Sequence, residues 1–116
     1  MRMGGLFPSI LALGLMGGMA DAAQGTISWY GVEACRVNRH PGCPTASGRS
    51  LHRLIQQHVP YCATRKHTFG TWLTVSGSNG SAKCQVWDRG PARTLGRMVD
   101  VAPGVFEEVC GSLTTQ

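Results

Sequence analysis

The spacing of hydrophobic and polar positions changes along the chain, and each spacing predicts a different element. Residues 26–30 alternate and are rich in β-formers, which predicts a strand closed by Gly31. Residues 35–48 hold two prolines, two glycines and two cysteines, a composition typical of a loop. In residues 50–59 the apolar side chains recur at helical spacing, so we expect a helical turn or two before Pro60.

The second half of the chain reads mainly as β-structure. Residues 72–75 and 83–87 are predicted strands, and 76–80 is a hairpin turn in which Asn79 and Gly80 suit positive φ. Residues 97–101 form one more predicted strand, and 103–110 a helix with Pro103 in its first turn. The pattern therefore predicts one all-β domain with one or two short helices.

The first residues have the features of an export signal. Arg2 precedes an apolar stretch over residues 6–16, which is too short and too glycine-rich to predict a membrane span. Ala20 and Ala22 are the small residues that a signal peptidase reads, so we place cleavage after Ala22. We expect residues 1–22 to be a signal peptide and 23–116 to be a monomeric domain, exported to the periplasm or beyond and not inserted in the membrane.

The five cysteines of an exported chain are expected to form disulfides. The close cysteine or histidine pairs of a zinc site are missing from the sequence, so we expect no metal. Local spacing favours Cys35–Cys43, within the loop, and Cys62–Cys84, at the outer ends of the β unit. Cys110 is then left over or pairs with another chain. Other pairings stay open, because sequence alone does not fix connectivity.

The formal net charge of +5 favours an anionic polymer as partner, although the charge also serves solubility. Loss of residues 1–22 removes Arg2 and Asp21 and leaves this balance unchanged. Peptidoglycan and teichoic acids are anionic polymers of the kind an exported protein meets. Nucleic acid is not expected as a partner, because the chain is exported and lacks interleaved aromatic and basic residues.

Five segments in order resemble one known family. They are the strand and glycine at 25–31, the turn at 45–48, the "FGT" strand at 69–75, the "VWDRGP" segment at 86–91, and 96–101. In these segments the chain resembles the double-psi β-barrel domains of the rare lipoprotein A family, which are more distantly similar to expansins and barwin. The resemblance covers nearly all of residues 23–116 and implies a six-stranded double-psi β-barrel.

The cell-wall enzymes of that family are lytic transglycosylases, which cut between N-acetylmuramic acid and N-acetylglucosamine without a metal or cofactor. The resemblance carries their "DRGP" aspartate over to Asp88, which would act as the catalytic acid and base. The histidine that family enzymes often carry before "FGT" is replaced here by Thr64, and the family serine is replaced by Ala102. His67 is the candidate substitute, but strand alternation would place it on the opposite face from Thr64.

Further candidate residues would bind the glycan. Trp29 and Tyr30 could stack on sugar rings, and Arg89, Arg97 and Asp100 could contact its polar groups. Each has a structural alternative: aromatic residues of a small barrel are often core, and Asp100 could pair with Arg97 or cap a turn. Asp88 could equally cap the turn that follows it by accepting backbone N–H groups.

Two functions of different class are therefore predicted. The "DRGP" aspartate favours a peptidoglycan lytic transglycosylase, whereas the missing family histidine favours a non-catalytic barrel that binds wall polysaccharide. A secreted effector or inhibitor on the same barrel is a third possibility, which nothing in the sequence requires.

Overall fold

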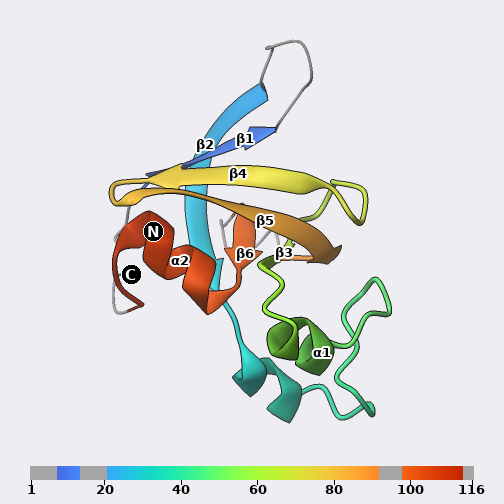
Figure 1. Cartoon of the computed structure of the whole chain (residues 1–116). Helices are drawn as coiled ribbons and strands as arrows, with labels where there is room; N and C mark the ends of the chain where they lie inside the picture. The colour runs from blue at the N-terminus through green and yellow to red at the C-terminus, as the bar shows by residue number, and fades with distance from the viewer. Residues whose placement is uncertain (1–7, 14–20, 92–97, 114–116) are drawn as a thin grey trace.

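The computed structural model describes residues 8–13, 21–91 and 98–113 and is built mainly from β-strands (Figure 1). The strands are β1 Pro8–Leu13, β2 Asp21–Trp29, β3 Tyr61–Ala63, β4 Trp72–Gly77, β5 Gly80–Asp88 and β6 Val99–Val101. Their hydrogen-bonded order is β1-β2-β6-β3-β5-β4, and β4 pairs back onto β1. The ring mixes parallel pairs, β2–β6 and β3–β5, with antiparallel ones.

The all-β class is confirmed, but the strands are not distributed as the sequence predicts. The region after Ala22 supplies β2, β6, β3, β5 and β4, which form a curled mixed sheet, a half-barrel of five strands. The sixth strand, β1, comes from the predicted signal peptide. The expectation of six strands within residues 23–116 is therefore not met by the described part of that region, because the segment that follows β6 is a helix.

The helices are short and lie outside the sheet. Beyond the 3-10 helix η1 (Val32–Arg36) comes α1 (Leu51–Gln56), which begins at Ser50, whose side chain accepts a hydrogen bond from the Arg53 N–H. Helix α2 spans Pro103–Cys110, as predicted, and ends at Gly111 with φ +90°. Figure 1 shows α2 against the curled sheet and η1 and α1 together below it. In the described residues, none of the helices has both the length and the apolar character needed to cross a bilayer.

The predicted β4–β5 hairpin is present, but its turn is shifted by one residue. Gly77 pairs with Gly80, so Ser78 and Asn79 are the loop residues rather than Asn79 and Gly80. The end of α2 holds this turn, because the Asn79 N–H donates to the Val109 carbonyl at 2.9 Å. A Cβ at Gly77 would lie 2.6 Å from Val109 Cγ1, so only glycine permits this approach of helix and hairpin.

The core lies between the inner face of the sheet and α2. Residues of β4, β5 and β6 are buried alternately, as expected for a sheet with one covered face, whereas all three residues of β3 are buried. The side chains that meet there are Leu73, Val75, Cys84, Val86, Val99, Val101, Phe106 and Val109, all at most 2% exposed. This packing fixes the ends of β2, β5 and β6, where the candidate site lies.

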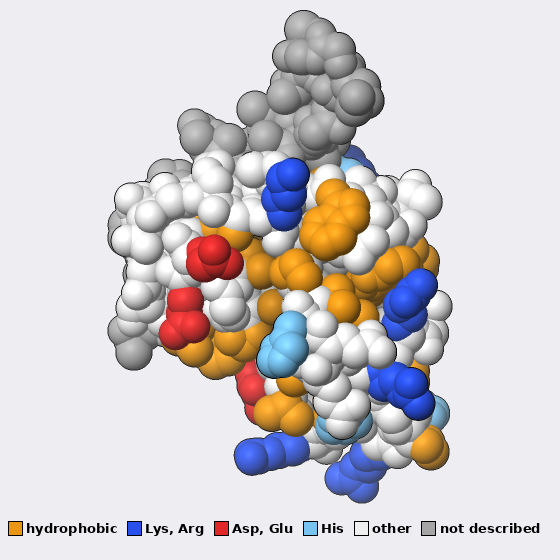
Figure 2. All heavy atoms as spheres, in the orientation of Figure 1, with side chains coloured by type: hydrophobic (Ala, Val, Ile, Leu, Met, Phe, Trp, Pro, Cys, Tyr) orange, Lys and Arg blue, Asp and Glu red, His pale blue; other side chains and the backbone are white. Residues whose placement is uncertain are grey.

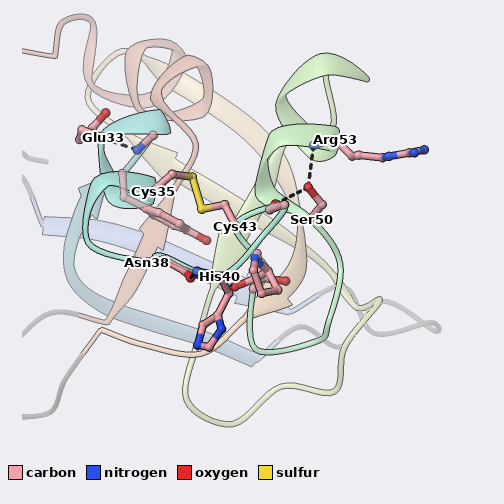
Figure 3. Close-up of a disulfide and its surroundings, with 12 residues drawn as sticks. Glu33, Cys35, Asn38, His40, Cys43, Ser50 and Arg53 are labelled. Atoms are coloured by element: carbon pink, nitrogen blue, oxygen red, sulfur yellow. Dashed lines mark hydrogen bonds between the residues drawn. A yellow bond between two sulfur atoms is a disulfide. The ribbon is translucent and has the colours of Figure 1, made fainter.

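Both predicted disulfides are confirmed. Cys35–Cys43 joins η1 to the following loop (Figure 3), and Cys62–Cys84 joins β3 to β5 through the core. Their Cα–Cα distances are 5.5 and 5.7 Å, within the ordinary range for such bonds. Cys110 is buried in α2 and is in neither disulfide. Two disulfides in a small domain indicate an oxidising, exported compartment.

Candidate functional site

Asp88 is the last residue of β5, and its carboxylate accepts three hydrogen bonds. Oδ1 accepts from the backbone N–H groups of Ala46, at 2.8 Å, and Arg89, at 2.9 Å. Oδ2 accepts from the Tyr30 hydroxyl at 3.1 Å. The sequence left Asp88 open between a catalytic acid and a turn cap. The structure gives Oδ1 the capping role, whereas Oδ2 accepts its hydrogen bond from a side-chain hydroxyl.

The turn at residues 45–48 is part of this site, and sequence analysis did not assign it that role. Thr45 is 8% exposed, and its hydroxyl donates to the Arg49 carbonyl at 2.8 Å. The Ser47 N–H donates to the Trp87 carbonyl at 3.2 Å, which ties the turn to the end of β5. These bonds hold the Ala46 N–H against Asp88. The signal was available in the "TASG" turn, which the family resemblance already singled out.

Tyr30 follows β2 and joins the two halves of the site. Its ring meets Tyr61 edge to face with 5.1 Å between centroids, and the Tyr61 hydroxyl donates to the Tyr30 carbonyl at 2.7 Å. Burial, and then the negative charge of Asp88, raise the pKa of Tyr30 well above its ordinary value. The phenol is therefore neutral at physiological pH and keeps its proton for the bond to Asp88.

A second carboxylate, Asp100, lies in the same region. It sits on β6 beside Ser28 of β2, its register partner, and the Ser28 hydroxyl donates to Asp100 Oδ1. Asp100 also contributes to the raised pKa of Tyr30, so both carboxylates lie near the phenol. The sequence prediction that Asp100 belongs to the site is consistent with this placement, and Ser28 is a neighbour that the sequence did not reveal.

These groups line a pocket of about 250 Å³. Its lining is made of Tyr30, Ala34, Asn38, Cys43, Pro44, Thr45, Leu51, Ala63, Asp88, Arg89 and Asp100. Pockets that enclose a drug-sized ligand are typically about 300–1,000 Å³, so this one suits a single unit of a longer chain. Two carboxylates, a phenol and a guanidinium are a set that can bind polar groups and transfer protons.

The Cys35–Cys43 disulfide forms one wall of this pocket through Cys43 (Figure 3). The Asn38 side chain donates to the Pro44 carbonyl at 2.9 Å, and its carbonyl oxygen accepts from the His40 N–H at 3.1 Å. The disulfide and these bonds hold the loop in place along the pocket. His52 lies beside the two sulfurs, all within 4.8 Å, but the sulfurs are bonded to each other and offer no thiolate ligand.

His67 lies next to Thr64, the residue that the resemblance aligns with the family histidine. The ring Nδ1 of His67 is 3.3 Å from Thr64 Oγ1, and the backbone N–H of His67 donates to the same oxygen at 3.4 Å. The expectation that the two residues face opposite sides fails, because β3 ends at Ala63 and strand alternation stops there. Burial, followed by the charges of Arg89 and Lys66, lowers the pKa of His67. His67 is nevertheless not in the lining of the Asp88 pocket.

Of the two arginines that were predicted to contact the glycan, Arg89 and Arg97, only Arg89 can be placed in the site. Arg89 lines the pocket, with its guanidinium carbon 3.9 Å from the Phe69 ring centroid and Nη1 donating to the Thr64 carbonyl at 3.4 Å. Arg97 falls outside the residues that the structure describes. Arg49, which the sequence did not single out, lies 3.9 Å over the Trp87 ring beside the site.

The predicted aromatic residues are not all brought to the pocket. Tyr30 lines it, but Trp29 packs against the core and its indole N–H donates to the Leu113 carbonyl at 3.3 Å. The structural alternative therefore describes Trp29 better than sugar stacking. Trp72, at the start of β4, is 49% exposed and does not line the pocket.

A larger pocket, of about 490 Å³, lies between η1, the α1–β3 connection and α2. Most of its lining is apolar, with Glu33, Glu108 and His58 among it. Figure 2 shows exposed hydrophobic side chains on this side, with acidic groups to one side and basic groups to the other. The Tyr30–Tyr61 ring contact joins a lining residue of one pocket to a lining residue of the other, and the larger pocket contains none of the predicted site residues.

Comparison with known proteins adds no assignment. No protein-family model matches the chain, and no curated protein matches it significantly. The rare lipoprotein A resemblance therefore stays a prediction from the sequence motifs.

Proposed function

We propose that this chain is an exported lytic transglycosylase that cleaves peptidoglycan glycan strands at the Asp88 pocket. In this proposal the fold is the rare lipoprotein A-like double-psi β-barrel, with β1 in the place of one strand. The enzyme works as a monomer in the periplasm or outside the cell and needs neither metal nor cofactor. The observation that carries the proposal is the convergence of Asp88, Asp100 and Tyr30 on one sugar-sized pocket.

The proposed reaction uses one carboxyl group twice. Protonated Asp88 gives its proton to the glycosidic oxygen while the bond from that oxygen to the muramyl C1 breaks. The muramyl O6 then bonds to C1, and its hydroxyl proton passes to the Asp88 carboxylate. The products are a 1,6-anhydro end and a free 4-hydroxyl, no water is consumed, and Asp88 is protonated again.

The hydrogen bonds favour one carboxylate oxygen as the proton carrier of the proposed reaction. Because Oδ1 accepts two backbone N–H groups, Oδ2 is the oxygen that would carry the proton. In the structure the Tyr30 hydroxyl donates to the Asp88 carboxylate. When Asp88 carries the proton, the same phenol oxygen can accept it in a hydrogen bond, because a phenol does both. Arg89 and Asp100 would contact the hydroxyl and amide groups of the sugar.

A second function, binding without cleavage, is favoured by a separate observation. Every Asp88 oxygen has a partner within the protein, and His67 is not in the pocket lining. An aspartate that ties β5 to the 45–48 turn would serve a polysaccharide-binding barrel equally well. The net charge of +5 suits an anionic wall polymer in either case.

Incubating the exported protein with purified glycan strands that lack stem peptides separates the two functions. Mass spectrometry of the products should show 1,6-anhydro ends for the wild type and none for Asp88→Asn. The amide can still accept both backbone N–H groups, so folding should survive in that variant. Glu107→Gln on α2 is the matched control, because it makes the same chemical change at an exposed carboxylate outside the pocket.

The outcomes are distinct. Cleavage that is lost in Asp88→Asn and kept in Glu107→Gln supports the enzyme. Sedimentation with intact sacculi without any anhydro product leaves only the binding function. If the protein neither sediments with sacculi nor cleaves the strands, both proposed functions are overturned.

A further inference from the structure

Strand β1 is the link that closes the ring of strands. On one side it pairs antiparallel with β2, from Pro8 opposite Thr26 to Leu13 opposite Asp21. On the other it pairs antiparallel with β4, from Ile10 opposite Ser76 to Leu13 opposite Leu73. No described strand of the region after Ala22 joins β2 to β4.

Cleavage after Ala22, the site predicted from the sequence, would remove β1 together with the first residues of β2. The register then leaves two strand edges, residues 23–26 of β2 and residues 73–76 of β4, on either side of one empty strand position. Backbone N–H and C=O groups on both edges lose their partners, and an unpaired edge is a template for another strand. Leu73 and Val75, both fully buried, are on one of these edges.

Direct pairing of β2 with β4 is not a simple alternative. Neighbouring strands lie about 4.8 Å apart, so edges that flank an intervening strand are separated by roughly 9.6 Å. Closing that distance would move β4 across the core, where Gly77 already sits against Val109 and Asn79 is bonded to the end of α2. Close-packed interiors resist displacements of that size.

We infer that the mature chain binds an extended, apolar segment of a partner protein as its sixth strand, between β2 and β4. The chemistry of the occupant is given by the segment that fills the position in the whole chain, Pro-Ser-Ile-Leu-Ala-Leu, which carries no charge. Strand addition of this kind draws affinity from the backbone ladder and specificity from alternate side chains. The inference rests on cleavage at Ala22 and does not depend on the proposed enzymatic activity.

The register specifies which positions of the partner must be apolar. Residues directly opposite one another in an antiparallel pair project to the same face of the sheet. The two positions opposite Leu73 and Val75 therefore face the core, whereas the position opposite Thr74 faces the other side. In the numbering of β1 the first two are positions 11 and 13, and the third is position 12.

The experiment begins with the exported protein, secreted with its own leader and sequenced from its N-terminus. A synthetic peptide with the β1 sequence, extended by lysines outside residues 8–13 for solubility, is then titrated into it. We expect saturable one-to-one binding, a raised thermal midpoint, and slowed amide exchange at alternate residues of 23–26 and 73–76. Leu11→Lys with Leu13→Lys in the peptide should weaken binding at least tenfold, whereas Ala12→Lys, the matched control, should bind nearly as well.

Several results would overturn the inference. An exported protein that still contains residues 8–13 keeps its sixth strand in cis and needs no partner. Slow exchange at those same alternate residues of 73–76 in the monomer without peptide would mean that β2 and β4 pair directly, and slow exchange there in a dimer would make a second copy the occupant. A protein that is unfolded alone and folds on adding the peptide supports the inference, and one that stays unfolded with the peptide contradicts it.

Discussion

Replacing Tyr30 with phenylalanine tests the link between the two sides of the site. The change removes the hydroxyl that donates to Asp88 Oδ2 at 3.1 Å. The ring is kept, so its edge-to-face contact with Tyr61 is kept as well. The backbone carbonyl that accepts from the Tyr61 hydroxyl is untouched. Loss of stability in this variant can therefore be attributed mainly to the bond with Asp88.

The magnitude follows from the type of bond. Hydrogen bonds to a charged group contribute about 1.5–3 kcal/mol to stability. Asp88 is only half-buried, so water partly replaces the lost donor, and we expect the lower end of that range, about 1.5 kcal/mol. This corresponds to about a tenfold change in the folding equilibrium constant.

A double-mutant cycle with Asp88→Ala isolates the pair from the separate effect of each change. The free energies of unfolding of wild type, both single variants and the double variant are measured in urea at neutral pH with the disulfides intact. We expect a coupling energy of about 1 kcal/mol or more. A coupling indistinguishable from zero would show that the hydroxyl and the carboxylate do not interact in solution, and the proton route proposed through Tyr30 would fail with it.

Three further outcomes are expected from other parts of the chain. Removing the Cys62–Cys84 disulfide, with its sequence separation of 22, should lower the free energy of unfolding by about 3.4 kcal/mol. Removing Cys35–Cys43, with a separation of 8, should lower it by about 2.5 kcal/mol. The disulfides are removed by replacing both cysteines of a pair with alanine, and the reverse order of the two losses would contradict the loop-entropy argument. In thermal melts Gly77→Ala should destabilise, because its Cβ would overlap Val109, while Gly104→Ala on α2 meets no atom within 4 Å and should stabilise by up to about 1 kcal/mol. Finally, burial is the main cause of the raised pKa of both tyrosines. Their contribution to the free energy of unfolding should be fully present below pH 10 and should fall as the pH rises further, since only the tyrosines of the unfolded chain ionise there. A tyrosinate absorbance titration of the native protein with a midpoint near pH 10 would refute this prediction.

Local elements of this chain could be predicted from local patterns. Helix α2 has the predicted bounds, because a proline at its start and a glycine after its end mark both termini. The pairing Cys62–Cys84 followed from the positions of the two cysteines in the β unit, and the disulfide between β3 and β5 confirms it. The hairpin turn was off by one residue, since its position is set by the contact of Asn79 with α2, 29 residues or more away in sequence.

The candidate site was predictable only as far as a motif contained it. Asp88 came from "DRGP", but its amide partner Ala46 lies 42 residues away, and no periodicity in the sequence joins the two. The predicted orientation of His67 was wrong because strand alternation does not continue past Ala63, where β3 ends. Side-chain partners that depend on where a strand stops are set by packing, which the sequence pattern does not carry.

The sixth strand shows the same limit on the scale of the whole fold. A hydrophobic stretch of the length of residues 6–16 fits a signal peptide and a buried strand alike, because both need only a short apolar run. In the whole chain part of this run is β1, with a partner on each side. An export signal that also satisfies two sheet edges would protect them from aggregation until the leader is removed. The folding of the domain and the timing of cleavage would then be coupled, and the N-terminus of the exported protein decides whether β2 and β4 are left to bind another chain.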